Sequence, residues 1–356
     1  MKNAPLYVPI VKTKRGELKA LRKLDSARQS LIIPLVDIHR ISKFPESKTK
    51  DSLDKHLEKI GLVLSTYWKN PAFIDFSTID LTARTPNGNH PVEFFFRFNS
   101  NNNWIPVTGL DRDEAYLSAC QKIVKTYGTE LCIRLLEDDL EDPAETEEQI
   151  QEILNLCDLS VNECHLFMDL KYIVAEDFLK KKETAIHFIN NFAGIKHFAS
   201  LSLSSSSFPD SLVGNKNSTY KILRLDFFFW RAVLAEKKLV RKPIYSDYGV
   251  VNPNNPDLNP QAIAPSAKIR YTSTNDWIII KGSSVRKGQK YGQFYSLSAS
   301  AISLPEYRGK HYSWGDNFIF ECATERKKTG NLERWVKVDT NHHITFVVDQ
   351  IANIGV

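Results

Sequence analysis

Short apolar runs rich in β-branched residues alternate with segments of helical periodicity along most of this chain. Such runs cover residues 31–38, 72–79, 130–137, 164–170, 198–205 and 242–250. Buried strands separated by helices are typical of parallel β/α units. With 6–12 as a first strand and 277–282 as a last one, the pattern predicts eight strands and favours a (β/α)8 TIM-barrel-like fold. A doubly wound open sheet is the alternative, because a strand count does not establish closure.

The whole chain, residues 1–356, is predicted to be a single (β/α)8-like domain with two insertions. The first insertion lies near 82–110, where Asn, Gly and Pro cluster around an aromatic run and predict an excursion with a hairpin. The second lies near 250–270 and begins with an Asn/Pro-rich loop that has no helical pattern. A helix is predicted over 220–238, and a last amphipathic helix is predicted after Asn341 as its N-cap.

One polar side chain stands near the end of each of the six runs. These residues are Asp37, Asp75, Arg134, Asp169, Ser204 and Asp247. In β/α barrels the carboxyl ends of the strands carry the chemistry, so the four aspartates are predicted to be catalytic. Aspartates on one rim repel each other, so we expect a divalent cation, an arginine or raised pKa values to offset their charge. Carboxylate oxygens suit Mg²⁺ or Mn²⁺, and the predicted metal ligands are Asp37, Asp75 and Asp169.

Basic side chains are predicted to face the aspartates and to hold an anionic ligand. A guanidinium fork can grip phosphate or carboxylate, which points to Arg134 and Arg270. Lysines at the ends of the first and last strands would meet if the barrel closes between them. The predicted ligand contacts are Lys12, Lys14, Arg134, Ser204, Arg270, Tyr271, Lys281 and His342. A competing interpretation is structural, because strand-end aspartates also cap helices and pin turns.

Composition narrows the class of protein only moderately. The 47 basic and 42 acidic residues give a net charge of +5, and the basic residues are spread along the chain rather than gathered in one stripe. Five cysteines form no CxxC pair, so reduced thiols and a cytoplasmic location are expected. No apolar run reaches the about 18 residues that span a bilayer, and no membrane association is predicted.

Several motifs resemble those of a known family. They are the K-x-K-x-G-E turn after the first strand, the Arg270-Tyr271 pair, the stretch 313–316 (SWGD) and Asn341-His342-His343. Through them nearly the whole chain resembles the beta family of proteins found in bacteria and their phages. The resemblance carries no established reaction. It implies an accessory protein of a mobile element or of an antiviral-defence system.

Two classes of function stay open at this point. In the first, a polar, anion-binding pocket belongs to an enzyme, namely a metal-assisted phosphodiesterase or a nucleotide or nucleic-acid hydrolase. In the second, the protein is a non-catalytic sensor or interaction protein that recognises a phage component, a nucleotide or a partner protein. A barrel hosts many functions and does not choose between them. Bound metal at the aspartates would favour the enzyme, whereas a pocket walled by Arg–Asp pairs with no room for a ligand would favour the interaction protein.

Overall fold

The chain folds into two compact units. The computed structural model describes residues 4–39, 52–212, 216–254, 265–326 and 328–355. The first unit comprises Met1–Thr13, Ser30–Ser206 and Leu225–Tyr248, and the second comprises Lys14–Gln29, Ser207–Arg224 and Gly249–Val356. The assignment of residues 1–356 to a single domain stays a prediction.

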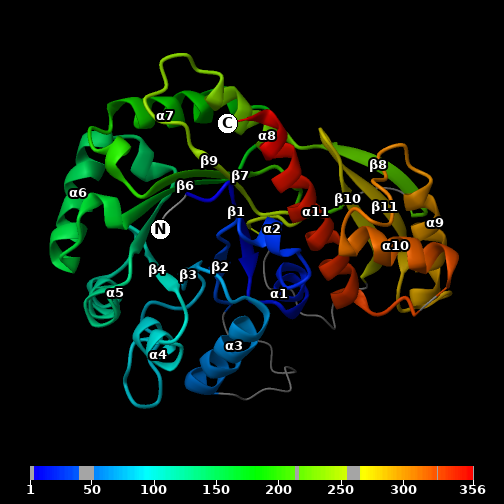
Figure 1. Ribbon diagram of the computed structural model, residues 1–356, viewed down its shortest axis with the longest axis horizontal. Helices are drawn as coiled ribbons and strands as arrows, with labels where there is room; N and C mark the ends of the chain where they lie inside the picture. Colours follow the sequence, from blue (N-terminus) through cyan, green and yellow to red (C-terminus); the bar gives the residue numbers. More distant parts are fainter. Residues whose placement is uncertain (1–3, 40–51, 213–215, 255–264, 327, 356) are drawn as a thin grey trace. The chain divides into compact units, whose positions relative to one another are not determined.

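The first unit is a closed barrel of parallel strands in the order β1-β2-β3-β4-β5-β6-β7-β9 (Figure 1). Its strands are β1 (Tyr7–Lys12), β2 (Leu35–Asp37), β3 (Ala72–Asp75), β4 (Trp104–Thr108), β5 (Leu131–Leu135), β6 (Cys164–Tyr172), β7 (Ser200–Ser206) and β9 (Ile244–Asp247). The barrel confirms the predicted (β/α)8 fold. Because β1 pairs with β9, the sheet is closed and the doubly wound open sheet is excluded.

Helices surround this barrel (Figure 1). They are α3 (Leu53–Tyr67), α4 (Pro91–Phe98), α5 (Glu114–Tyr127), α6 (Pro143–Cys157), α7 (Phe178–Asn191) and α8 (Leu225–Leu234), with short 3-10 turns η1 (Asp138–Leu140), η2 (Val161–Glu163) and η3 (Ile195–His197). Local sequence sets several of their ends. Asp113 caps α5 by accepting from the Tyr116 amide at 2.8 Å, and Gly128 ends the same helix in the left-handed conformation, with φ 58°.

Three predicted elements are wrong. The segment 82–110 is not an excursion with a hairpin, because it contains α4 and the barrel strand β4. The segment 277–282 is not the eighth barrel strand, since β9 holds that position. The predicted helix over 220–238 contains the end of a strand before α8 begins. An apolar run shows that a strand is buried, but it does not show which strand it pairs with.

The second unit is built on a three-stranded antiparallel sheet in the order β10-β11-β8. Its elements are α1 (Arg15–Leu21), α2 (Ser26–Gln29), β8 (Ser218–Leu223), β10 (Ser266–Thr272), β11 (Asp276–Ser284), η4 (Lys290–Gln293), α9 (Phe294–Ile302), α10 (Trp314–Thr324) and α11 (Leu332–Ile354). One face of the sheet packs into a core in which Trp335 stacks on Phe294 with ring centroids 4.2 Å apart. Part of the insertion predicted near 250–270 lies outside the described residues.

The last helix is longer than predicted. It begins at Leu332, and its N-cap is Asn331, whose side chain accepts from the Arg334 amide at 3.1 Å. Asn341 is therefore not a cap but a buried residue within the helix. His342 and His343 are buried as well. The predicted amphipathic pattern fails here because α11 buries polar side chains along with apolar ones.

Candidate functional site

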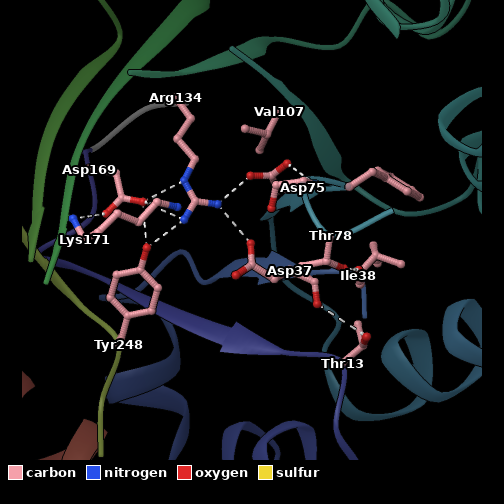
Figure 2. Close-up of polar contacts among 12 residues, drawn as sticks. Thr13, Asp37, Ile38, Asp75, Thr78, Val107, Arg134, Asp169, Lys171 and Tyr248 are labelled. Carbon is pink, nitrogen blue, oxygen red and sulfur yellow. Dashed lines mark hydrogen bonds and ion pairs between the residues drawn. The ribbon is translucent and has the colours of Figure 1, made fainter. Parts of the chain in front are cut away.

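The centre of the barrel rim is the guanidinium of Arg134, which projects from β5 among three aspartates (Figure 2). Nη1 donates to Asp37 Oδ1 at 3.0 Å and to Asp75 Oδ2 at 2.5 Å. Nε and Nη2 donate to Asp169 Oδ2 at 3.0 and 2.7 Å. Nη2 also donates to the hydroxyl of Tyr248 at 2.9 Å. An arginine has five N–H donors, and all of them are engaged in these bonds.

Strand register places the three carboxylates around Arg134. Asp37 and Asp75 are direct partners at the ends of neighbouring strands β2 and β3. Asp169 on β6 is the partner of Ser204 on β7. Within the described part of the chain, the buried Ser204 hydroxyl has no hydrogen-bond partner. The sequence thus predicted correctly that Arg134 and three of the aspartates meet, and that an arginine offsets their charge.

Asp247 does not point into this cluster. Its Oδ1 accepts from the hydroxyl of Tyr7 at 2.5 Å, and Tyr7 stacks on Tyr245 with centroids 5.7 Å apart. Tyr245 packs on Trp230 of α8. Residues two apart on a strand share a face, so Asp247 faces the helix layer with Tyr245. The expectation that all four aspartates face inward is wrong for Asp247, because a one-residue change of register moves a side chain to the other face.

Lys171 carries a positive charge at the exposed edge of the cluster. Its ammonium lies 3.0 Å from Asp169 Oδ2, and its side chain is 39% exposed. The residue lies in the left-handed region with φ 54°, where the pairing of β6 with β7 is irregular. Its amide donates to Asp169 Oδ1 at 3.0 Å. The irregularity therefore turns Lys171 back over a carboxylate that is itself fully buried.

Two further cations lie on the same rim. Arg112 approaches Asp75 Oδ1 with Nη2 at 3.4 Å and donates from Nη1 to Asp111 at 2.8 Å. Lys12, a predicted ligand contact, is the strand partner of Asp37 on β1. Lys171, Arg112 and Tyr248 were not predicted from the sequence. The one available signal was position, since Tyr248 directly follows β9 and Lys171 lies two residues after Asp169.

The environment separates the pKa values of the carboxyls. Burial raises the pKa of Asp37, and the neighbouring Asp75 adds to the rise against the opposing effect of Arg134. Burial also acts to raise the pKa of Asp169, but Arg134, Lys171 and the hydroxyl of Tyr248 outweigh it and lower that pKa. Asp37 therefore takes up a proton more readily than Asp169. Two carboxyls with divergent pKa values are the arrangement in which one donates a proton while the other stays ionised.

The donor set does not fit the predicted metal. The predicted ligands Asp37, Asp75 and Asp169 each accept a hydrogen bond from Arg134, whose charge lies between them. A divalent ion at that position would repel the guanidinium. Among the described residues, no group of three His, Cys, Asp or Glu side chains is arranged to hold a metal ion. The proposed Mg²⁺ or Mn²⁺ thus has no carboxylate group here that is free of Arg134.

The remaining predicted ligand contacts belong to the second unit. Lys14 is the N-cap residue of α1. Lys281 lies on β11 and donates to the carbonyl of Leu212 at 2.7 Å, so it does not end a barrel strand next to Lys12. Arg270 and Tyr271 lie on β10, and His342 lies on α11.

These second-unit residues form a buried polar network. Asp316 accepts from the hydroxyl of Tyr271 at 2.7 Å and from the hydroxyl of Ser313 at 2.5 Å. His342 Nδ1 lies 2.8 Å from Asp316 Oδ2, and its Nε2 lies 2.9 Å from the carbonyl of Thr272. A carbonyl only accepts, so Nε2 carries a proton and donates. The motif residues predicted as ligand contacts hold β10, α10 and α11 together.

The fold and the rim define a class, namely a (β/α)8-barrel protein whose strand ends enclose an Arg–Asp cluster. The family model described as Beta protein matches residues 7–349. The chain therefore belongs to the Beta protein family. None of the curated proteins matches this chain. Among the residues that the structure describes, no helix combines the length and apolar character needed to cross a membrane.

Asp37→Asn tests the assignment of the raised pKa. A carboxyl whose pKa is raised by folding contributes stability below its unfolded pKa of about 4, and this contribution is lost as pH rises through the folded pKa. Asparagine keeps an acceptor for Arg134 and does not ionise. We expect the difference in stability between the two proteins to be constant below the unfolded pKa of about 4 and to shift in favour of Asp37→Asn as pH rises. Urea unfolding from acidic pH to about pH 8 checks this, and a difference that stays constant with pH would contradict it.

Proposed function

We propose that the rim of the barrel recognises a small phosphate-bearing ligand, and that the protein acts as a ligand-binding component rather than through a metal. The observation that carries this proposal is the position of Lys171. Its ammonium is partly exposed, while the carboxylate that holds it is buried on the Arg134 cluster. A cation fixed in this way is available to a ligand without losing its own partner.

Arg134 is the scaffold of the site in this proposal. Because its five donors are engaged within the rim, it has none left for a ligand. It fixes the carboxylates, and the ligand meets the groups around them. When Asp37 is protonated, its carboxylic acid can donate to a phosphate oxygen, and its raised pKa favours this form. Arg112 adds a second positive charge beside Asp75.

The charge balance of the rim supports an anionic ligand. Four cations, those of Arg134, Arg112, Lys171 and Lys12, match four carboxylates, those of Asp37, Asp75, Asp111 and Asp169, when all of them are ionised. The raised pKa of Asp37 moves this balance toward positive. A phosphate ester brings the negative charge and the acceptor oxygens that such a rim lacks. A nucleotide belongs to this chemical class.

The biological setting rests on the family alone. Members of the Beta protein family resemble accessory proteins of bacterial mobile elements and antiviral-defence systems. A barrel that binds a nucleotide or a phage-derived phosphate compound would act there as a sensor. In cells, we expect a strain that carries Lys171→Met in place of the native protein to lose phage resistance. A phage-infection assay measures this loss.

An acid–base enzyme is the second candidate function. The observation that favours it is the divergence of the pKa values of Asp37 and Asp169, one raised and the other lowered. In a hydrolase, Asp37 would protonate a leaving group while the ionised Asp169 orients Lys171. An enzyme of this kind would release phosphate or a nucleoside from a bound ligand. If the protein does so and Asp37→Asn does not, the result favours this second candidate function.

Thermal unfolding with a panel of nucleotides and phosphate esters, each with EDTA, Mg²⁺ or Mn²⁺, tests the proposed function. A ligand at 100 times its Kd stabilises the native state by about 2.7 kcal/mol. We expect such a stabilisation in EDTA, its loss in Lys171→Met, and its retention in Lys180→Met, which removes an exposed lysine of α7. No stabilisation by any phosphate compound, or one that requires the metal, would contradict the proposal.

A further inference from the structure

A cavity lies within the second unit, between α1 and the beginning of α11. Its volume is about 410 Å³, and it is lined by Arg15, Lys19, Asn331, Glu333, Arg334 and Lys337. This volume falls in the range of small-molecule sites, about 300–1,000 Å³. Four of the six lining residues are basic. Within the cavity only Glu333 is acidic, and its carboxylate already accepts from Lys19 at 2.5 Å.

Three of the cations form no ion pair with a carboxylate among the described residues, namely Arg15, Arg334 and Lys337. Lys19 is paired with Glu333, and the charges of Lys19, Arg15 and Arg334 all help to lower the pKa of that one carboxyl. Lys337 is only 7% exposed and yet lines the cavity. Its pKa is lowered by burial and by positive neighbouring charges, which is the environment of an anion site.

Aromatic rings of α10 hold two of these cations in place. The ammonium of Lys337 lies 3.7 Å from the centroid of the Trp314 ring. The guanidinium of Arg334 lies 5.4 Å from the ring of Phe318 and 5.9 Å from that of Trp314. Cation–π contacts stabilise a cation without neutralising it. Both side chains are thus ordered on α10 and keep their charge for the cavity.

Close packing of α1 and α11 brings the lining residues of the two helices together. A Cβ at Gly16 would lie 3.0 Å from the Glu333 carbonyl and 3.0 Å from Val336. Glycine therefore allows α1 to approach α11 at this point. Burial and the neighbouring charges of Arg334, Lys23, Lys19 and Arg22 lower the pKa of Lys337 to about 8. A bound anion would relieve this repulsion between like charges.

We propose that this cavity, referred to below as the α1–α11 site, binds a small molecule with two or more linked phosphates, such as a nucleoside diphosphate or triphosphate. One phosphate would meet Lys337 and Arg334, which the aromatic rings of α10 hold in place. The next would meet Arg15, which also lines the cavity. The arrangement of several unpaired cations around one cavity suits a ligand with several negative charges better than a single phosphate ion. The α1–α11 site is separate from the barrel rim and stands whether or not the rim binds a ligand.

Titration of tryptophan fluorescence in the full chain tests this site, with pyrophosphate, ATP and inorganic phosphate as probes. We expect saturable binding of pyrophosphate and ATP, and at least about tenfold weaker binding in Lys337→Met and in Arg334→Gln, because each removes a charge-assisted contact. Lys328→Gln, which removes an exposed lysine just before α11, should bind as wild type does. Because Trp314 belongs to the second unit, the fluorescence change that depends on it separates this site from the rim. Trp314→Phe should remove most of the fluorescence change.

The stability of each variant without ligand separates a loss of binding from a loss of folding. Lys337→Met relieves repulsion among like charges, so its melting temperature without ligand should equal or exceed that of wild type. Lost binding in a stable variant then reports the site itself. Three results would overturn the proposal: no binding of pyrophosphate or ATP, equal binding by Lys337→Met, or binding only of a long oligonucleotide with steep salt dependence, which would indicate a nucleic-acid track instead.

Discussion

Replacing Arg134 with methionine should destabilise the barrel by about 3–5 kcal/mol, the effect of removing one partner from a buried ion pair. The guanidinium is the shared partner of Asp37, Asp75 and Asp169. The guanidinium and the three carboxylates are all buried. Without it the carboxylates repel each other in a medium of low dielectric constant. Urea unfolding followed by circular dichroism measures the loss. Arg231→Met, on the exposed face of α8, is the matched control and should change stability by less than about 0.5 kcal/mol.

A rescue distinguishes lost charge balance from lost packing. Changing the three aspartates to asparagine in the Arg134→Met background removes the charges that the arginine neutralised. Replacing a whole buried ionic group with neutral residues is often nearly harmless, so this quadruple variant should recover much of the lost stability. If Arg134→Met costs less than about 1 kcal/mol, the value of a surface pair, the cluster is not the buried ionic centre described above. A quadruple variant as unstable as Arg134→Met would assign the loss to packing.

The order of strands and helices was predictable for most of the barrel, because parallel strands covered on both faces give near-continuous apolar runs. Strand β4 was missed because WIPVT is short, contains Pro106 and lies among asparagines. The segment 277–282 was assigned to the barrel because its apolar run resembles a barrel strand. It pairs antiparallel with β10 and β8 instead, and periodicity alone does not identify a pairing partner.

The candidate site, like the fold, was predictable from the sequence in part. Asp37, Asp75, Arg134 and Asp169 could be placed together, since strand ends of one barrel converge. The outward turn of Asp247 depends on register, which the sequence does not fix. The α1–α11 site could not be found at all, because Lys19 and Lys337 are 318 positions apart and each is an ordinary lysine in its own segment.

The family motifs have a structural explanation in the second unit. A Cβ at Gly315 would lie 2.6 Å from the carbonyl of Val338, so glycine allows α10 to touch α11. The amide of Gly315 donates to Asn341 Oδ1 at 2.9 Å. Asp316 and His342 lie next to this contact, with His342 Nδ1 2.8 Å from Asp316 Oδ2. Helix packing and this buried contact therefore give the SWGD and Asn341-His342 motifs a structural role.

Asp316→Ala should destabilise the second unit by about 3–5 kcal/mol, because it leaves His342 buried without its carboxylate and removes the acceptor of Tyr271. Burial alone would raise the pKa of Asp316, but His342 and the hydroxyls of Ser313 and Tyr271 outweigh it and lower that pKa. A lowered pKa means that the contribution to stability is present above the unfolded pKa of about 3.9 and is lost as pH falls through the folded value. The gap in stability between wild type and Asp316→Ala should therefore be constant near neutral pH and shrink below about pH 4.

Urea unfolding of wild type, Asp316→Ala and His342→Gln, with the double variant, measures this coupling as a double-mutant cycle. Two units can unfold in separate transitions. Circular dichroism and tryptophan fluorescence both follow the whole chain, since the six tryptophans are divided between the two units, and the transition that Asp316→Ala shifts is assigned to the second unit. Asp210→Asn, an exposed carboxylate of the same unit, is the control and should leave stability unchanged. We expect the double variant to be less destabilised than the sum of the single ones. Strict additivity would mean that Asp316 and His342 do not act as an ion pair, and that the motif residues stabilise the fold by packing alone.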